Sequence, residues 1–205
     1  MTGKQFGILI VPIKPFQHAK GRLAESLSPT SRARLARECA EYVLEAADGL
    51  DIVVVTDASA DNDVPAWAAA RGVTCLTQSS LGLNGAVRDG VAFAQSRNYT
   101  IAVIAHSDVP LATSVRAFLE PDTICIVPDQ AKDGTNLLSL PLSKPAACEF
   151  QFHYRPGSFL AHEAESIACG FTPRIAIDAR WALDLDEPHD LLNQQVKEAL
   201  PWLTM

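Results

Sequence analysis

The sequence lacks a long hydrophobic run, an excess of positive charge and a cysteine framework. Its longest uninterrupted apolar stretch, Ile8–Ile13, is far shorter than the roughly 20 residues that span a bilayer, and no basic leader segment precedes it. The 17 Lys and Arg against 24 Asp and Glu give a formal net charge of −7, so the chain has no overall positive field to bind nucleic acid or an anionic membrane. The five cysteines are scattered and form no C-x-x-C pair, which argues against a disulfide framework and a structural zinc site. We expect a cytoplasmic protein with reduced cysteines.

The chain also lacks a Gly/Ser linker, a low-complexity tract and an internal repeat, so its 205 residues are expected to form one domain, 1–205. Short runs rich in Ile, Val and Leu predict buried strands at Phe6–Ile13, Ile52–Val55, Ile101–Ala105, Ile124–Val127, Leu137–Leu142 and Arg174–Ile177. Helix-period segments separate these runs. The alternation predicts an α/β fold of three layers, with helices on both faces of a mostly parallel sheet and ligands at the carboxyl ends of its strands.

Capping residues predict where the helices begin. Ser28 followed by Pro29 predicts the start of a helix that ends at Gly49. The same reasoning predicts four further helices with their N-caps: Asp63 for a segment to Gly72, Asn84 for Gly85–Arg97, Ser158 for Phe159–Ala168, and Asp186 for Pro188–Leu200.

An unusually long connection, Pro12–Leu23, follows the first predicted strand. It holds Lys14, Lys20 and Arg22 but matches neither the Walker motif nor the dinucleotide-binding glycine pattern. One interpretation is a solvated basic loop, because exposed Lys and Arg are common on protein surfaces. The other is a clamp on a triphosphate, in which Lys14 meets phosphate as a point charge while Lys20 and Arg22 close over it.

Carboxylates follow two other predicted extended segments. Asp108 stands directly after a buried strand and is followed by Val-Pro, which suits a ligand for a hard cation such as Mg²⁺ but also suits a simple turn or cap. Asp184 and Asp186 are two residues apart, so in an extended chain both point to one face and could share a cation with Asp108. His106 and Ser107 form no convincing nucleophile and base pair.

Three further segments are rich in small residues: Gly82–Ala86, Pro128–Asn136 and Tyr154–Phe159. Glycine lets backbone N–H groups approach a ligand, and Thr135, Asn136 and Ser158 supply hydrogen bonds without bulk. Each segment taken alone is equally typical of an ordinary turn.

Taken in order, these segments resemble the phospholactate and phosphoenolpyruvate guanylyltransferases of deazaflavin coenzyme biosynthesis, over residues 8 to 192. The resemblance is carried by Val11–Lys14, Ala19–Leu23, Gly82–Asn84, Asp108–Leu111, Pro128–Asp129, Gly134–Asn136, Pro156–Phe159 with His162, and Leu183–Pro188. It implies a glycosyltransferase-A-like nucleotidyltransferase fold with a seven-stranded mixed sheet. It also implies a reaction that joins the phosphate of a three-carbon phospho-acid to the α-phosphate of GTP, with Mg²⁺ and with release of pyrophosphate.

The resemblance implies site residues as well. Lys14 and Asp108 are expected to be catalytic, Thr135 and Ser158 to bind the phospho-acid, and Asp108 and Asp184 to carry metal, with Asp186 open between ligand and helix cap. The full set expected to bind substrate is Lys14, Lys20, Arg22, Gly82, Asn84, Gly85, Thr135, Arg155, Gly157 and Ser158. We place guanine near Gly82–Gly85. The acid is phospholactate, phosphoenolpyruvate or 3-phosphoglycerate, nucleic acid and membrane are not expected partners, and a homodimer stays open.

The chain departs from the family pattern at two positions. Arg155 stands where the family commonly has the first glycine of Gly-Pro-Gly-Ser, which adds a cation near the expected acid site. His106 stands where related transferases carry the first carboxylate of an Asp-x-Asp pair. Two other functions remain: another transferase of the same fold, such as a sugar-phosphate or molybdopterin nucleotidyltransferase or a glycosyltransferase, and a non-catalytic nucleotide-binding protein.

Overall fold

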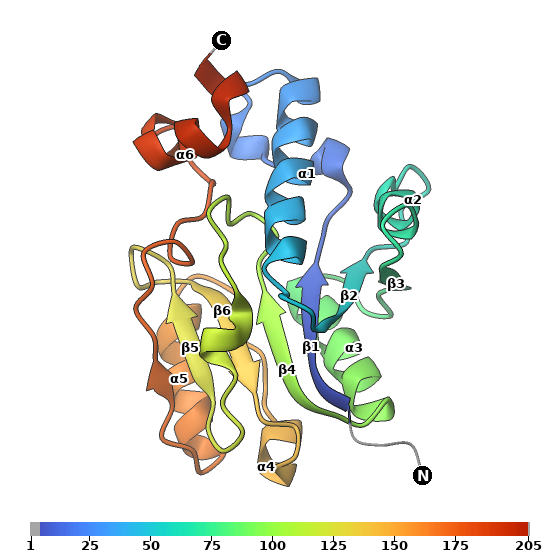
Figure 1. Ribbon diagram of the computed structural model, residues 1–205, viewed down its shortest axis with the longest axis vertical. Coiled ribbons are helices and arrows are strands. Elements are labelled where there is room, and N and C mark those ends of the chain that lie inside the picture. The colour runs from blue at the N-terminus through green and yellow to red at the C-terminus, as the bar shows by residue number, and fades with distance from the viewer. Residues whose placement is uncertain (1–4, 205) are drawn as a thin grey trace.

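A seven-stranded mixed sheet forms the centre of the protein, in the order β3-β2-β1-β4-β6-β5-β7 (Figure 1). The structure is a computed structural model and describes residues 5–204. Its strands are β1 (Gln5–Pro12), β2 (Asp51–Thr56), β3 (Thr74–Thr77), β4 (Tyr99–Ala105), β5 (Cys125–Pro128), β6 (Thr135–Leu140) and β7 (Arg174–Ile175). Strand β6 is antiparallel to both its neighbours, β4 and β5, and the other pairs are parallel.

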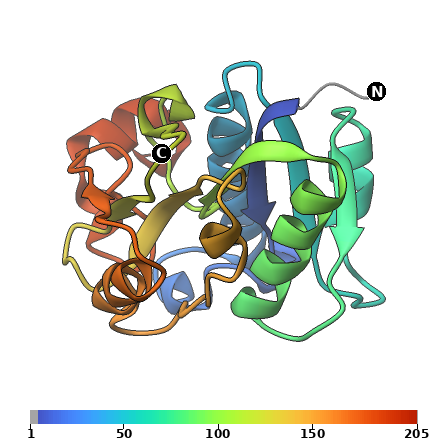
Figure 2. The same ribbon diagram turned by 90° about the horizontal axis from the view of Figure 1, so that it is seen from below.

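Helices cover both faces of this sheet, which confirms the predicted three-layer α/β fold. They are α1 (Pro29–Glu45), α2 (Val64–Ala69), α3 (Leu83–Ser96), α4 (Pro145–Cys148), α5 (Ser158–Ala168) and α6 (Gln194–Ala199). Figure 2 shows α3 and α5 on one face, and the buried residues of α1 and α2 pack into the core of the opposite face. In the part of the chain that is described, no helix combines the length and the apolar character needed to cross a membrane.

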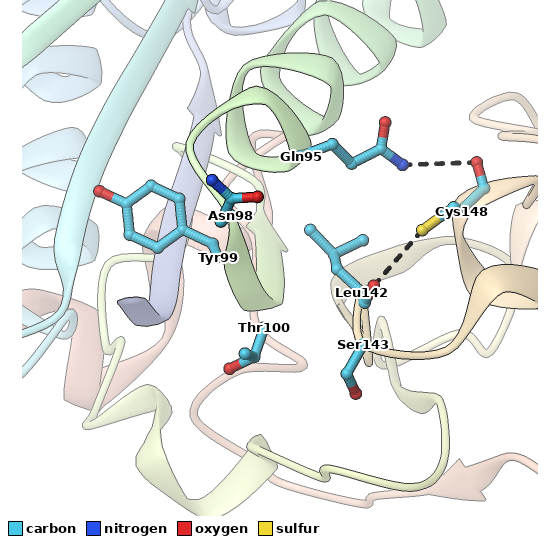
Figure 3. Close-up of a pocket in the computed structure, with 7 residues that line it drawn as sticks. All are labelled: Gln95, Asn98, Tyr99, Thr100, Leu142, Ser143 and Cys148. Carbon is cyan, nitrogen blue, oxygen red and sulfur yellow. Dashed lines mark hydrogen bonds between the residues drawn. The ribbon is translucent and has the colours of Figure 1, made fainter. Parts of the chain in front are cut away.

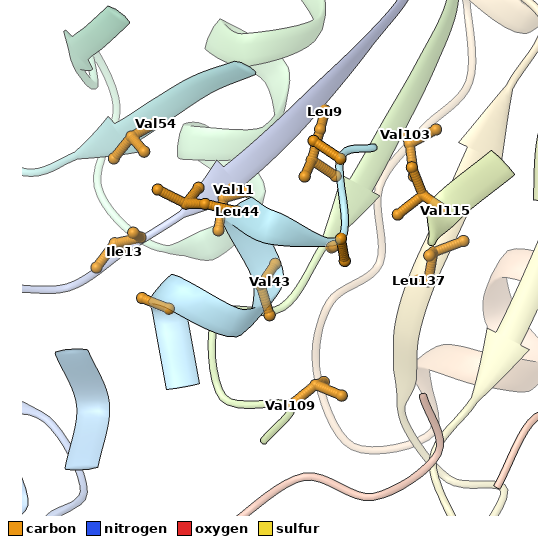
Figure 4. Close-up of a cluster of buried hydrophobic side chains, with 14 of the residues drawn as sticks. Leu9, Val11, Ile13, Val43, Leu44, Val54, Val103, Val109, Val115 and Leu137 are labelled. Atoms are coloured by element: carbon orange, nitrogen blue, oxygen red, sulfur yellow. The ribbon is translucent and has the colours of Figure 1, made fainter. Parts of the chain in front are cut away.

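The central strand β1 shows why the sheet is buried on both faces. Ile8 and Ile10 enter the core beneath α3, whereas Leu9 and Val11 enter the core beneath α1 (Figure 4). All four are almost fully buried, and burial of each such side chain contributes about 1.5–3 kcal/mol. A continuous apolar run is therefore what a central strand between two helical layers requires.

The predicted helix starts are confirmed at α1 and corrected elsewhere. Ser28 caps α1, because its Oγ accepts the N–H of Ser31 at 3.1 Å. Helices α3 and α5 instead begin after glycines in the left-handed region, Gly82 (φ 85°) and Gly157 (φ 79°). Asn84 and Ser158 therefore lie inside their helices and cap neither of them.

Asp63 is also not a side-chain cap, although it precedes α2. Its Oδ1 accepts the N–H of Phe16 at 3.2 Å, while Asn62 Oδ1 accepts the N–H of Val64 at 3.0 Å. Asp63 thus joins the loop after β1 to α2, and the neighbouring asparagine satisfies the helix start.

The C-terminal segment is not the single helix predicted at Pro188–Leu200. A 3-10 turn at Asp190–Leu192 precedes the short α6, which Asn193 caps. The carboxylate of Asp190 accepts the N–H groups of Asp186 and Glu187, so Asp186 is not a cap. The Asp186 side chain instead contacts Lys20 and Arg22, which lie in the connection after β1.

Strand direction places the candidate residues at one edge of the sheet. The parallel strands β1 and β4 end at the same edge, and the antiparallel β6 begins there. The connection after β1, Asp108 after β4 and Thr135 at the start of β6 therefore converge. The backbone also joins the end of β4 to the start of β6, because the N–H of His106 donates to the carbonyl of Asn136 at 3.0 Å.

Candidate active site

A buried ammonium group lies between two carboxylates at this edge. Lys20 Nζ is 2.9 Å from Asp108 Oδ2 and 3.3 Å from Asp186 Oδ1, and the Lys20 side chain is only 6% exposed. Burial disfavours the charge of Lys20, but Asp108 and Asp186 outweigh this effect and raise its pKa. The ammonium is therefore charged at neutral pH.

Asp108 connects the two carboxylate motifs that the sequence singled out. Its backbone carbonyl accepts the N–H of Leu185 at 3.1 Å, which holds the segment with Asp184 and Asp186 against the end of β4. Burial opposes its charge, but the nearby Lys20 lowers the pKa of the Asp108 carboxyl below its ordinary value. Its second oxygen, Oδ1, is buried and has no hydrogen-bond partner among the described residues.

Asp184 carries its negative charge with little compensation. Its Oδ1 accepts one hydrogen bond, from Asn136 Nδ2 at 3.4 Å. Burial, followed by the charges of Asp108 and Asp186, raises the pKa of Asp184 to about 6. Three carboxylates therefore share a small region in which one lysine and the more exposed Arg22 are the neighbouring cations.

The donor set fits a divalent cation, although no such site is preassembled. Within residues 5–204, no three His, Cys, Asp or Glu side chains surround a common position for a metal ion. Lys20 instead lies between Asp108 and Asp186. Carboxylate oxygens are nevertheless the ligands that Mg²⁺ prefers, and the unpartnered Asp108 Oδ1 and the poorly compensated Asp184 supply them.

A second, neutral cluster lies at the start of β6. The N–H of His153 donates to His162 Nε2 at 2.9 Å, so the proton of the neutral ring is on Nδ1, which donates to Thr135 Oγ1 at 3.0 Å. Burial, with smaller effects from His153 and His106, lowers the pKa of His162 to about 3 and keeps the ring neutral. Ser158 Oγ is 3.5 Å from the same Thr135 oxygen. The threonine hydroxyl is thereby left to donate its own proton elsewhere.

The loop between β5 and β6 is attached to the start of α5 by Asp133. Asp133 Oδ1 accepts the N–H of Gly157 at 3.1 Å, and its carbonyl accepts the N–H of Phe159 at 3.0 Å. Asp129 shapes the loop by accepting the N–H groups of Asp133 and Gly134, and a Cβ at Gly134 would lie 2.7 Å from Asp129 Oδ2. Asp133 in this loop therefore binds the Gly157 N–H group, which we expected to face the phospho-acid.

The predicted guanine segment contacts the predicted acid segment. Asn84 Oδ1 accepts the N–H of Tyr154 at 2.8 Å, and Asn84 Nδ2 is 3.4 Å from the Tyr154 carbonyl. Gly85 packs against the preceding loop so closely that a Cβ there would lie 2.3 Å from the Ser80 carbonyl. Gly82 provides the positive φ at the helix start. The Asn84 amide thus holds the segment before α5 beside α3.

The remaining predicted cations differ in their surroundings. Arg22 Nη1 lies 3.6 Å from Asp186 Oδ2 and 3.1 Å from Glu187 Oε1, and its side chain is 69% exposed. Lys14 and Arg155 are exposed, and neither side chain forms a hydrogen bond or ion pair with another residue in the described range. Lys20 and Arg22 therefore join the carboxylate group, whereas Lys14 and Arg155 extend into solvent.

Three residues of this region were not expected to bind ligand from the sequence. His162 and Asp133 are described above, and Tyr154 has a buried hydroxyl without a partner among the described residues. His106 Nε2 is also buried and unpartnered, and the rings of His106 and Tyr154 are 5.3 Å apart. His162 is among the residues that carry the family resemblance, and Asp133 and Tyr154 lie in glycine-containing segments, but none of these signals reveals the contacts or the burial of the side chains.

Two hollows lie outside this group. A cavity of about 380 Å³ opens near the amino end of β4, at the edge of the sheet away from Asp108 (Figure 3); it is lined by Gln95, Asn98, Tyr99, Thr100, Leu142, Ser143 and Cys148. A smaller one of about 210 Å³ lies between residues 128–132 and 177–182. Neither hollow contains Lys20, Asp108 or Thr135 in its lining.

Known proteins match nearly the whole length of this chain. Residues 7–197 match the family model described as "Guanylyl transferase CofC like". A phosphoenolpyruvate guanylyltransferase of Rubrobacter xylanophilus is 34% identical over 188 residues, which cover 89% of this chain and 90% of that protein. A 2-phospho-L-lactate guanylyltransferase of Methanothermobacter thermautotrophicus is 31% identical over 189 residues, which cover 89% of this chain and 81% of that protein.

Solved structures share the fold at low sequence identity. A putative nucleotide-diphospho-sugar transferase from Desulfovibrio desulfuricans superposes with a TM-score of 0.79 at 15% identity, covering 97% of this chain and 95% of that one. A nucleotidyl transferase from Methanothermobacter superposes with a TM-score of 0.65 at 14% identity, covering 98% of this chain and all of the other. These likenesses establish the type of sheet and its helical layers.

Proposed function

The chain belongs to the CofC-like guanylyl transferase family and is a nucleotidyltransferase, and we propose that it joins a three-carbon phospho-acid to GTP in deazaflavin coenzyme biosynthesis. A phosphate oxygen of the acid attacks the α-phosphorus of GTP, the bond to the β-phosphate oxygen breaks, and pyrophosphate leaves. The observation that supports this proposal most strongly is the convergence of Lys20, Asp108 and Asp184 at the sheet edge that also carries Thr135.

The reaction needs charge compensation more than it needs a base. The attacking phosphate is already largely ionised at neutral pH, because its second pKa is about 6. In phosphoryl-type transfer the protein mainly aligns the reactants and neutralises their charge. Lys20 and Arg22 supply positive charge beside the carboxylates, and Lys14 and Arg155 supply it from exposed positions. This explains how the chain can catalyse transfer without a Ser, His and Asp set.

We assign Mg²⁺ to Asp108 and Asp184, with Asp186 next to them. When bound, the ion supplies neutralisation of the triphosphate and of the charge that develops on the leaving pyrophosphate. Asp108 Oδ1 has no partner among the described residues, and a bound cation would offset the burial and the repulsion by Asp108 and Asp186 that raise the pKa of Asp184 to about 6. Asn136 holds the Asp184 carboxylate in place through the 3.4 Å contact with its amide.

We assign the phospho-acid to the cluster at the start of β6 and α5. Thr135 offers its hydroxyl proton, because its oxygen already accepts a hydrogen bond from His162. Ser158 lies beside this hydroxyl, and the N-terminus of the eleven-residue helix α5 favours an anion. Phosphoenolpyruvate is our first choice of acid, because relatives of 33–34% identity carry that activity in their names.

Incubation of the purified protein with GTP, Mg²⁺ and each of the three acids tests this proposal. We expect a guanosine-diphospho-linked acid by mass spectrometry together with stoichiometric pyrophosphate, and the fastest turnover with phosphoenolpyruvate. The Asp108→Asn protein is the matched control, because it keeps the size of the side chain and removes its charge. Absence of any linked product with all three acids contradicts the proposal, and turnover fastest with another acid contradicts only the choice of acid.

A further inference from the structure

Lys20 already occupies the place between two of the carboxylates that we assign to the metal site. We propose that Lys20 is a built-in counter-ion that closes this site in the free protein and leaves it only when a nucleotide triphosphate binds, so that divalent-cation binding depends on nucleotide binding. The inference rests on the proposed function in one respect, the assignment of Asp108 and its neighbours as metal ligands.

The contacts of Lys20 are those of a resident cation. Its Nζ contacts Asp108 Oδ2 at 2.9 Å and Asp186 Oδ1 at 3.3 Å, and 94% of the side chain is shielded, given its 6% exposure. A divalent ion on Asp108 would lie within a few ångströms of this shielded ammonium, and two cations at that separation repel each other. The metal and the ammonium therefore compete for the same carboxylate.

The compensation that Lys20 gives is incomplete. One positive charge faces the three negative charges of Asp108, Asp184 and Asp186, which leaves a local charge of −2 before Arg22 is counted. Asp108 Oδ1 remains buried without a partner among the described residues. The carboxylates thus retain the capacity to hold a cation of higher charge once the ammonium moves away.

The backbone at Lys20 allows such a movement. Lys20 has φ 57° and ψ 40°, a left-handed conformation that is unfavourable for a residue with a Cβ, and it lies between short 3-10 turns at Phe16–His18 and Gly21–Leu23. A Cβ placed on the following Gly21 would meet nothing within 4 Å, so the space beside this residue is open. Return of Lys20 to a right-handed or extended conformation relieves the strain and redirects its side chain.

A triphosphate supplies the new partner. It carries more negative charge than the carboxylate pair, and a lysine ammonium binds phosphate oxygens readily as a point charge. Transfer of Lys20 to the phosphates releases Asp108 and Asp186 at the moment when a divalent ion bound to the same phosphates arrives. Nucleotide and metal then enter together, and neither binds well alone.

Binding of Mn²⁺ in the absence of nucleotide tests the inference directly. Free Mn²⁺ is measured by electron paramagnetic resonance during titration of the wild type, Lys20→Met and Arg22→Met. Arg22 is the matched control, because it carries the same charge and contacts the same Asp186 but does not touch Asp108. We expect Lys20→Met to bind Mn²⁺ at least tenfold more tightly than the wild type, and Arg22→Met to change the affinity by less than threefold.

Other results overturn the inference. Equal gains in both variants would show a general effect of charge, and no gain in Lys20→Met would show that the ammonium does not compete. Lys20→Arg retains the positive charge and is expected to bind Mn²⁺ as weakly as the wild type. If Lys20→Met does not fold by circular dichroism, the wild type alone decides: we expect a Mn²⁺ affinity in the millimolar range without nucleotide, and micromolar binding overturns the inference. Because no nucleotide or acid is present, these outcomes are independent of whether the protein transfers guanylyl groups.

Discussion

Substitution of Asp184 by asparagine is expected to stabilise the protein while it removes activity. Burial and the charges of Asp108 and Asp186 raise the pKa of Asp184 from 3.8 to about 6. A gap of about two pKa units corresponds to roughly 3 kcal/mol of folding free energy, at 1.36 kcal/mol per unit. Asparagine keeps the oxygen that accepts from Asn136 but cannot ionise, so it avoids this cost.

The sign of the pH dependence follows from the direction of the shift. Well below pH 3.8 the carboxyl is protonated in both the folded and the unfolded chain, and the substitution has little effect. Between this value and about 6 the unfolded chain releases the proton that the folded protein retains, so the wild type loses stability as the pH rises. Above about pH 6 the folded protein bears the full free-energy cost of ionising Asp184. The gain from Asp184→Asn therefore grows from near zero to about 3 kcal/mol at pH 8.

Urea unfolding at pH 4, 6 and 8 in the presence of EDTA measures this gain. Asp122→Asn serves as the control, because Asp122 forms an ion pair with Lys144 at a largely exposed position, where such pairs contribute about 0–1 kcal/mol. Turnover of Asp184→Asn with GTP and phosphoenolpyruvate is expected to fall by about 100-fold, which corresponds to about 3 kcal/mol in the barrier. Equal stability of Asp184→Asn and wild type at pH 8, or a gain that does not vary with pH, would refute the reasoning.

Three further predictions concern the chemistry. Asp108→Asn is expected to lower turnover by at least about 100-fold with an unchanged circular dichroism spectrum, since it removes a charge that we assign to metal binding; a folded variant with near-native turnover contradicts the assignment. GTP is expected to be used in strong preference to ATP, because a site that hydrogen-bonds one base edge leaves buried groups unpaired with the other, and equal turnover in competition assays would disprove this. Arg155→Gly is expected to lower kcat/KM for the preferred acid by about tenfold and to flatten the ranking of the three acids, because the charge-assisted contact that we propose between Arg155 and the bound acid would be lost. An unchanged ranking and efficiency would show that Arg155 plays no part in acid choice.

The sequence predicted the central strands well because both of their faces are buried. Strands β2 and β4 match their predicted ranges to within two residues, and their apolar runs are unambiguous. Strand β3 was missed, because Thr74–Thr77 is a half-exposed edge strand with polar ends. Strand β7 is shorter than predicted, and Ile177 is 70% exposed beyond its end. Edge strands bury one face at most and therefore give a weaker pattern.

The helix starts at the site were misplaced for a related reason. Polar side chains such as those of Asn84 and Ser158 are good caps in general, so they were chosen over the glycines before them. In the structure these side chains face inward, where Asn84 binds the backbone of Tyr154 and Ser158 lies against Thr135. Local preference predicts least well where a polar side chain has its partner far along the chain.

The candidate site residues were predicted one by one, but their pairing was not. Lys20 is 88 residues from Asp108 and 166 residues from Asp186 along the chain, so no local pattern could place its ammonium between them. The sequence suggested that Lys20 closes over phosphate, and the structure instead pairs it with carboxylates. The role of Asp133 was likewise hidden, because its partner is a backbone N–H group of Gly157.

These pairings have a common physical consequence for binding. Two hydrogen-bond donors of this region are already bound to carboxylates of the chain itself. The Lys20 ammonium donates to Asp108, and the Gly157 N–H group donates to Asp133. An anion that uses either donor must therefore replace a carboxylate rather than fill an unpaired site. Exchange costs affinity, because the displaced contacts and the order of the loops are lost. It also adds selectivity, because the partly buried Asp108 needs another cation once it loses Lys20, and a ligand that arrives with one avoids the cost of an uncompensated charge.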